Sequence, residues 1–122
     1  MVEEEIRDSD RIATLLRAEL EGLAGPPFES LAVADRTETA DLGDPAFDVR
    51  LGGKSVFTAT KQDDRLVLEF SQQPDAVLDA AETAGLPARP KATHPPTTVI
   101  FVERAAAVKR VIDVLRGTHD SQ

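Results

Sequence analysis

The stretch FDVRLGGKSVFTATKQDDRLVLEF, residues 47–70, decides the fold class of this chain. Apolar residues occupy every second position at its start (Phe47, Val49, Leu51) and at its end (Leu66, Leu68, Phe70), which is typical of strands with one buried face. Gly52-Gly53 indicates a two-residue hairpin loop, because glycine readily takes the positive φ that such a loop needs. Residues 62–64 supply a second turn, so the stretch predicts three antiparallel strands in succession.

The two-residue loop also sets which residues lie opposite one another across the first hairpin. The expected cross-strand pairs are Leu51 with Lys54, Val49 with Val56, and Phe47 with Thr58. This register turns Phe47 and Val49 toward the core together with Val56.

Three amphipathic helices flank these strands. The first is expected between Ser9 and Gly25, the second begins at Pro74, and the third runs from about Glu103 to Arg116 with Gly117 as its cap. Their expected inward-facing residues are Ile12, Leu15, Leu16, Leu20 and Leu23; Val77, Leu78, Ala81 and Ala84; and Val108, Val111, Ile112 and Leu115.

Two further strands, at residues 28–34 and 97–102, bring the sheet to about five strands. Residues 86–96 contain four prolines and are expected to lack regular structure. The element order α-β-β-β-β-α-β-α predicts an α+β two-layer sandwich, with a mainly antiparallel sheet and its helices on one face.

The length of 122 residues fits a single domain spanning 1–122, with residues 1–8 and 118–122 expected to be frayed. The chain contains no cysteine, which excludes disulfides, thiolate zinc sites and cysteine nucleophiles. It has neither the basic start of a signal peptide nor an apolar run of the ~20 residues that cross a bilayer. We therefore expect a cytoplasmic protein without a membrane segment.

The charge balance narrows the range of partners. The net charge is −8, from 22 acidic and 14 basic residues. Because nucleic acids and anionic membranes attract basic surfaces, this balance disfavours both as general partners, although a local basic patch is compatible with it.

No motif for catalysis is found. The chain lacks HExxH, GxSxG, GxGxxG and phosphate-loop patterns, so no catalytic residue and no cofactor is assigned. Asp35, Glu38, Asp41 and Asp44 could offer oxygen ligands to a hard cation. Their spacing does not match a known calcium loop, and a solvated acidic loop is the favoured interpretation, so no metal is assigned either.

The candidate binding residues are Arg89, Lys91 and His94, which lie in residues 86–96 without any acidic residue. Prolines hold such a segment extended and reduce the entropy lost on binding, which favours recognition of an anion or an acidic partner. The alternative is a long connection whose cations pair with the acidic residues of the protein itself.

Part of the chain resembles a family of small uncharacterised haloarchaeal proteins of unknown function. The similarity lies in RPKATHPP (residues 89–96), TVIFVE (98–103) and AVKRVIDVL (107–115), and in the opening helix with its Gly-Pro break; it covers about two-thirds of the chain. Ten arginines against four lysines fit such an origin, or GC-rich coding DNA in general. The resemblance implies a cytoplasmic haloarchaeal protein and supplies no activity.

Three hypotheses about function follow. The preferred one is a non-enzymatic protein-interaction module, with self-association through a sheet edge or an apolar helix face. The alternative is a small-molecule or anion-binding domain that uses residues 86–96. The third is an enzyme whose carboxylates are distant in the sequence and come together only when the chain folds. A polar pocket near Arg89 would favour the second, whereas a filled sandwich would favour the first.

Overall fold

The structure, a computed structural model, describes residues 9–23, 28, 31–35, 45–62, 64–93 and 95–119. The helices are α1 (Ser9–Glu21), α2 (Pro74–Ala84) and α3 (Val108–His119), the last preceded by a 3-10 turn, η2 (Ala105–Ala107). The strands are β1 (Leu31–Asp35), β2 (Pro45–Leu51), β3 (Lys54–Lys61), β4 (Leu66–Phe70), β5 (Ala88–Lys91) and β6 (Thr97–Val102).

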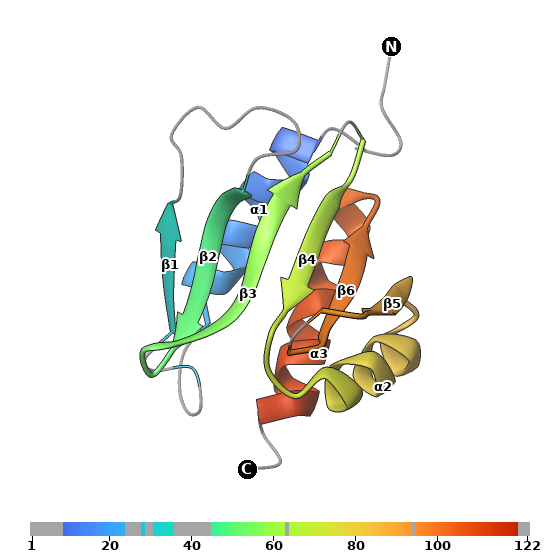
Figure 1. Ribbon diagram of the computed structural model, residues 1–122. Helices are drawn as coiled ribbons and strands as arrows, with labels where there is room; N and C mark the ends of the chain where they lie inside the picture. Colours follow the sequence, from blue (N-terminus) through green and yellow to red (C-terminus); the bar gives the residue numbers. More distant parts are fainter. Residues whose placement is uncertain are drawn as a thin grey trace.

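The six strands form one open sheet in the order β1-β2-β3-β4-β6-β5, and all neighbours are antiparallel (Figure 1). This confirms the predicted α+β class with an antiparallel sheet and three helices, whereas the expected count of five strands is one too low. Figure 1 shows α1 and α3 behind the sheet, and α2 packs on β5, β6 and α3.

The core lies between the sheet and these helices. Ile12, Leu16 and Leu20 of α1 are buried, as the helical periodicity predicts, and so is the whole predicted stripe of α3. On the sheet, alternate residues of β4 point inward to meet them. The opposite face, which we call the outer face, has no described helix over it. One of its rows of facing residues consists of Thr58, Glu69, Val99 and Arg89.

The predicted hairpin register is correct only next to the turn. Leu51 faces Lys54, but a bulge follows, and Val49 then faces Phe57 rather than Val56. A bulge adds one residue to a strand and reverses the side to which later side chains point. As a result Phe57 packs against Phe70 in the core, with ring centroids 4.9 Å apart, and Thr58 moves to the outer face.

The expectation that residues 86–96 lack regular structure is wrong for its first half. Residues 88–91 form β5, an edge strand that pairs with β6 from Ala88 opposite Ile100 to Lys91 opposite Thr97. Proline cannot donate a hydrogen bond to a neighbouring strand, and an edge strand tolerates it because only one side is paired. With β4 on its other side, β6 is the interior strand that its apolar sequence predicts.

The third helix differs from its prediction at both ends. It starts with η2 rather than at Glu103, and it runs through Gly117 to His119. Residue 118 is therefore not part of a frayed tail. Thr118 is 3% exposed, and its hydroxyl donates to the carbonyls of Val114 and Leu115. Residues 1–8 and 120–122 lie outside the described residues.

Candidate functional site

Two of the three predicted site residues lie on β5. Ala88 packs against the core with Ile100, so Arg89 and Lys91 lie on the outer face. His94 lies outside the described residues.

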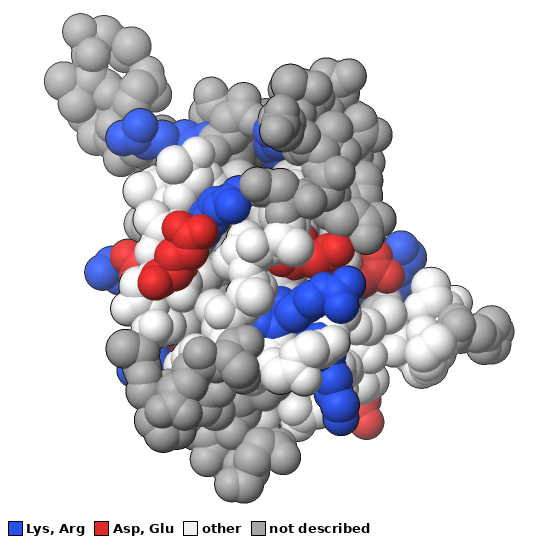
Figure 2. Space-filling view, turned by 90° about the vertical axis from the view of Figure 1, so that its left-hand side faces the viewer, with Lys and Arg blue, Asp and Glu red and all other residues white. Residues whose placement is uncertain are grey.

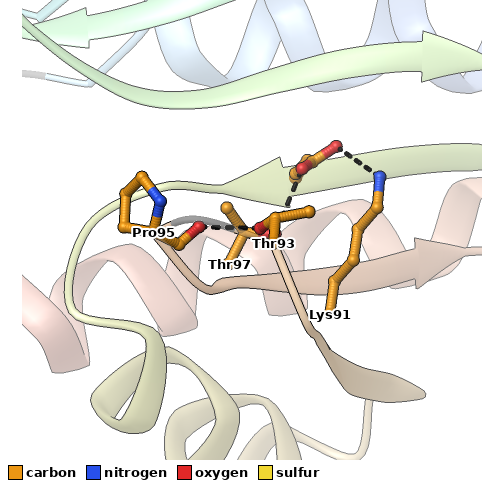
Figure 3. A network of polar contacts seen from close by, with 5 residues as sticks. Lys91, Thr93, Pro95 and Thr97 are labelled. Carbon is orange, nitrogen blue, oxygen red and sulfur yellow. Dashed lines mark hydrogen bonds and ion pairs between the residues drawn. The ribbon is translucent and has the colours of Figure 1, made fainter.

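Lys91 is engaged by an acidic residue of the protein itself. Its Nζ lies 3.4 Å from Oε1 of Glu69, and the hydroxyl of Thr97 donates to the other oxygen of the same carboxylate at 3.1 Å (Figure 3). Thr93 closes the end of this segment by donating to the carbonyl of Pro95 at 2.7 Å. For Lys91 this geometry matches the alternative interpretation, in which a cation of this segment pairs with the protein's own acid.

Arg89 has a different environment. Its guanidinium carbon lies 5.5 Å from the centre of the Phe101 ring, and that of Arg65 lies 4.4 Å from the same centre. The negative face of an aromatic ring attracts guanidinium groups at such distances. Arg65 also donates to Gln62 at 2.7 Å and lies 3.8 Å from a carboxylate oxygen of Glu103. Phe101 therefore contacts two arginines on one side of the sheet, Arg89 on β5 and Arg65 just before β4.

Two cavities lie at this end of the sheet and share Glu103 and Arg104 as lining residues. The larger has a volume of about 340 Å³ and lies where the end of α2, the start of β5 and η2 meet; it is lined by Gly85, Leu86, Pro87, Phe101, Glu103, Arg104, Ala106, Ala107 and Arg110. The smaller, about 210 Å³, is lined by Asp64, Arg65, Glu103 and Arg104. We call the two together the arginine pocket.

The walls of the arginine pocket are fixed by backbone contacts. The amide of Leu86 donates to the carbonyl of Ala81, and the amide of Phe101 donates to the carbonyl of Pro87, both at 2.9 Å. Arg110 reaches the carbonyl of Gly85 at 3.5 Å, a long contact that leaves most of its donors for other partners.

Three arginines line this pocket, and Arg89 lies beside it through Phe101. With Asp64 and Glu103 as the acidic lining residues, cations outnumber acids here among the described residues, in a chain of net charge −8. Guanidinium groups bind carboxylate and phosphate oxygens through paired hydrogen bonds. The arrangement is therefore chemically suited to an anion.

Sequence reasoning found Arg89 and missed Arg65, Arg104 and Arg110. Arg65 precedes β4, whereas Arg104 follows β6 and Arg110 belongs to α3, so Arg65 is far from the other two in the sequence. Arg65 and Arg104 could have been placed together, since each flanks a strand end in an antiparallel pair. That inference requires knowing that β4 and β6 are neighbours, as Leu66 opposite Val102 shows.

The predicted acidic loop gives no metal centre that the structure describes. Glu38, Asp41 and Asp44 lie outside the described residues, and the described ones contain no group of three potential ligands. Within the same part of the chain, no helix combines the length and apolar character that a membrane-spanning segment needs.

Comparison with known proteins places the chain in a family. Neither curated proteins nor solved structures gave a match to it. A family model matches residues 1–122, the full length of the sequence, and its description is "Family of unknown function (DUF7993)". The chain therefore belongs to the DUF7993 family of unknown function.

Proposed function

We propose that the protein binds a small anionic ligand in the arginine pocket. The observation that carries this proposal is the position of Arg104, which lines both cavities, with Arg110 in one and Arg65 in the other. A polar cavity beside Arg89 is also the feature expected to favour ligand binding over a filled interaction module.

The cations of the pocket differ in their role. Arg104 and Arg110 are exposed and line the larger cavity, so they are the direct contacts for the anion. Arg89 acts from the adjacent strand, where Phe101 holds its guanidinium in place. Each charge-assisted hydrogen bond to a bound anion is worth about 1.5–3 kcal/mol, and two such bonds give measurable affinity for a small ion.

The test is a calorimetric titration with inorganic pyrophosphate at low ionic strength. We expect the double variant Arg104→Gln/Arg110→Gln to bind at least tenfold more weakly than the wild type. The matched control is Arg50→Gln/Lys54→Gln, which removes the same charge from exposed residues at the opposite end of the sheet. Equal loss in both doubles would show that the effect is overall charge, and no loss in either would refute the proposal.

A second candidate function is self-association through β1, which retains the interaction-module hypothesis. Both β1 and β5 end the sheet, but only β5 carries a proline, an arginine and a lysine, which discourage edge pairing. Residues 31–34 of β1, Leu-Ala-Val-Ala, are uncharged, and β1 pairs with β2 without a bulge. Figure 2 shows the side of the molecule on which β1 lies, and acidic and basic side chains are interspersed on that side.

Light scattering across a range of concentrations tests this second candidate. We expect a mass of twice 13.2 kDa for the wild type and a monomer for Ala32→Lys, whose side chain is exposed. A wild type that remains monomeric at every concentration refutes it.

A further inference from the structure

We infer that the ligand of the arginine pocket is an acid with an apolar body the size of about one ring, rather than a simple inorganic anion. The inference rests on the proposed function, because it takes the anionic group as given and concerns the remainder of the ligand. Its basis is the contrast between the two cavities.

The described residues that line the smaller cavity are all charged, whereas the larger cavity has an apolar wall formed by Leu86, Pro87, Ala106 and Ala107. A bare anion gains nothing from such a wall. An apolar group placed against it removes both surfaces from water, which is favourable in proportion to the area buried.

The apolar wall is built in advance rather than formed on binding. Leu86 is 5% exposed and Ala107 is 9% exposed, so both belong to the core and present one side to the cavity. The hydrogen bonds from Leu86 to Ala81 and from Phe101 to Pro87 fix the backbone on this side. A preformed concave surface with few polar groups is typical of sites for small organic molecules.

The position of the acid within the cavity follows from the cations. Arg104 and Arg110 line the same cavity as the apolar wall, so one small molecule can reach both. Residues 106 and 107 lie in the turn that leads into α3, and the partial positive charge at a helix start adds to the attraction. We therefore place the acidic group toward Arg104 and Arg110 and the apolar body toward Leu86 and Pro87.

Phe101 does not serve as the stacking surface for this body. The guanidinium groups of Arg65 and Arg89 already lie over its ring. A volume of about 340 Å³ is near the lower end for small-molecule sites, which suits a single ring or a short branched chain and not a dinucleotide.

The experiment compares methyl phosphate with phenyl phosphate, which carry the same acidic group and differ in the body attached to it. We expect phenyl phosphate to bind the wild type about tenfold more tightly. The variant Ala106→Leu fills the cavity from an exposed position, so it should abolish this difference while methyl phosphate still binds. Ala76→Leu, at an exposed position on α2, is the matched control and should keep the difference.

The outcomes separate this inference from the proposed function. Equal affinity for the two esters, with loss of both in Arg104→Gln/Arg110→Gln, would overturn the apolar body and leave anion binding intact. A preference for phenyl phosphate that survives in Ala106→Leu would overturn its placement in this cavity. Failure of both esters to bind the wild type would overturn the inference and the proposed function together.

Discussion

Thr58 donates a hydrogen bond of 2.6 Å from its hydroxyl to Oδ1 of Asp48, across the outer face of the β2–β3 hairpin. The two residues face each other because the bulge beyond Val49 shifts the register by one residue. Without the bulge, Thr58 would lie opposite Phe47 on the side of the core. The register shift thus gives the carboxylate of Asp48, which is 6% exposed, a hydrogen-bond partner on the neighbouring strand.

Replacing Thr58 with valine should lower the free energy of unfolding by about 1.5–3 kcal/mol, the range for a hydrogen bond to a charged group. Valine keeps the branched shape and removes the donor, so Asp48 loses one partner in a buried position. Urea denaturation measures the change. Thr60→Val is the control, since Thr60 lies on the same face two residues away, opposite Val67. Similar losses in both variants would contradict the assigned role of the hydroxyl.

Local periodicity was enough to predict the helices. The stripes of α1 and α3 repeat every three to four residues, and the residues in them are buried or packed against the core. The bulge could not be predicted in this way, because Val56 and Phe57 are both buried and only packing decides which of them is the additional residue. Gly117 resembled a cap, yet burial of Thr118 favours continuing the helix beyond it.

The site was predictable only where its residues are close in sequence. Arg89 and Lys91 stand out because they are basic residues in a proline-rich segment of an acidic chain. That residues 88–91 form a strand could not be predicted, because Pro90 is compatible with a strand only at the edge of a sheet. The edge position of β5 follows from its pairing with β6, which the sequence does not reveal. Arg65 joins Arg104 at the pocket through the pairing of β4 with β6, for which the sequence has no local pattern.

The first helix should be essential to stability. Leu16 is 0% exposed at the centre of the α1 stripe, so Leu16→Ala is expected to cost about 2–5 kcal/mol, the range for truncating a buried leucine. Leu15→Ala, at a half-buried position on the same helix, should cost clearly less. Denaturant unfolding of both variants gives the comparison, and equal losses would contradict the deeper burial of Leu16 within the α1 stripe.

The cations of β5 should contribute little to folding. The Lys91 and Glu69 side chains are 51% and 38% exposed, and exposed ion pairs contribute about 0–1 kcal/mol. We therefore expect Arg89→Gln/Lys91→Gln to leave the melting temperature almost unchanged, as measured by circular dichroism. A much larger fall than in the charge-matched control Arg50→Gln/Lys54→Gln would mean that these cations are structural.

Salt should stabilise the fold. A net charge of −8 on a compact chain repels itself, and the range of this repulsion falls from ~10 Å in 0.1 M salt to ~3 Å in 1 M salt. The melting temperature should therefore rise between these concentrations of KCl. NaCl should raise it by a similar amount, because the screening of charges depends on ionic strength. A melting temperature that stays flat or falls would show that attractive ion pairs outweigh the net repulsion.

Two glycines should respond to alanine with opposite signs. Gly85 ends α2 with φ of 78°, in the left-handed region, where its amide donates to the carbonyls of Ala81 and Glu82. An added Cβ would lie 3.5 Å from Nη1 of Arg110, an ordinary contact, so the cost comes from the backbone and not from a clash. Left-handed backbone costs a residue other than glycine about 1–2 kcal/mol, and Gly85→Ala should lose that amount of stability.

Gly117 lies inside α3, and an added Cβ there would meet Cβ of Ala80 at 3.8 Å, again an ordinary contact. Its φ is not positive, so alanine fits the helix and restricts the unfolded chain. Gly117→Ala should therefore raise the free energy of unfolding by about 0.5–1 kcal/mol. Urea denaturation of both variants provides the measurement. If Gly117→Ala destabilised the protein as much as Gly85→Ala, residue 117 would be the end of the helix, as its sequence first indicates, and α3 would not continue to His119.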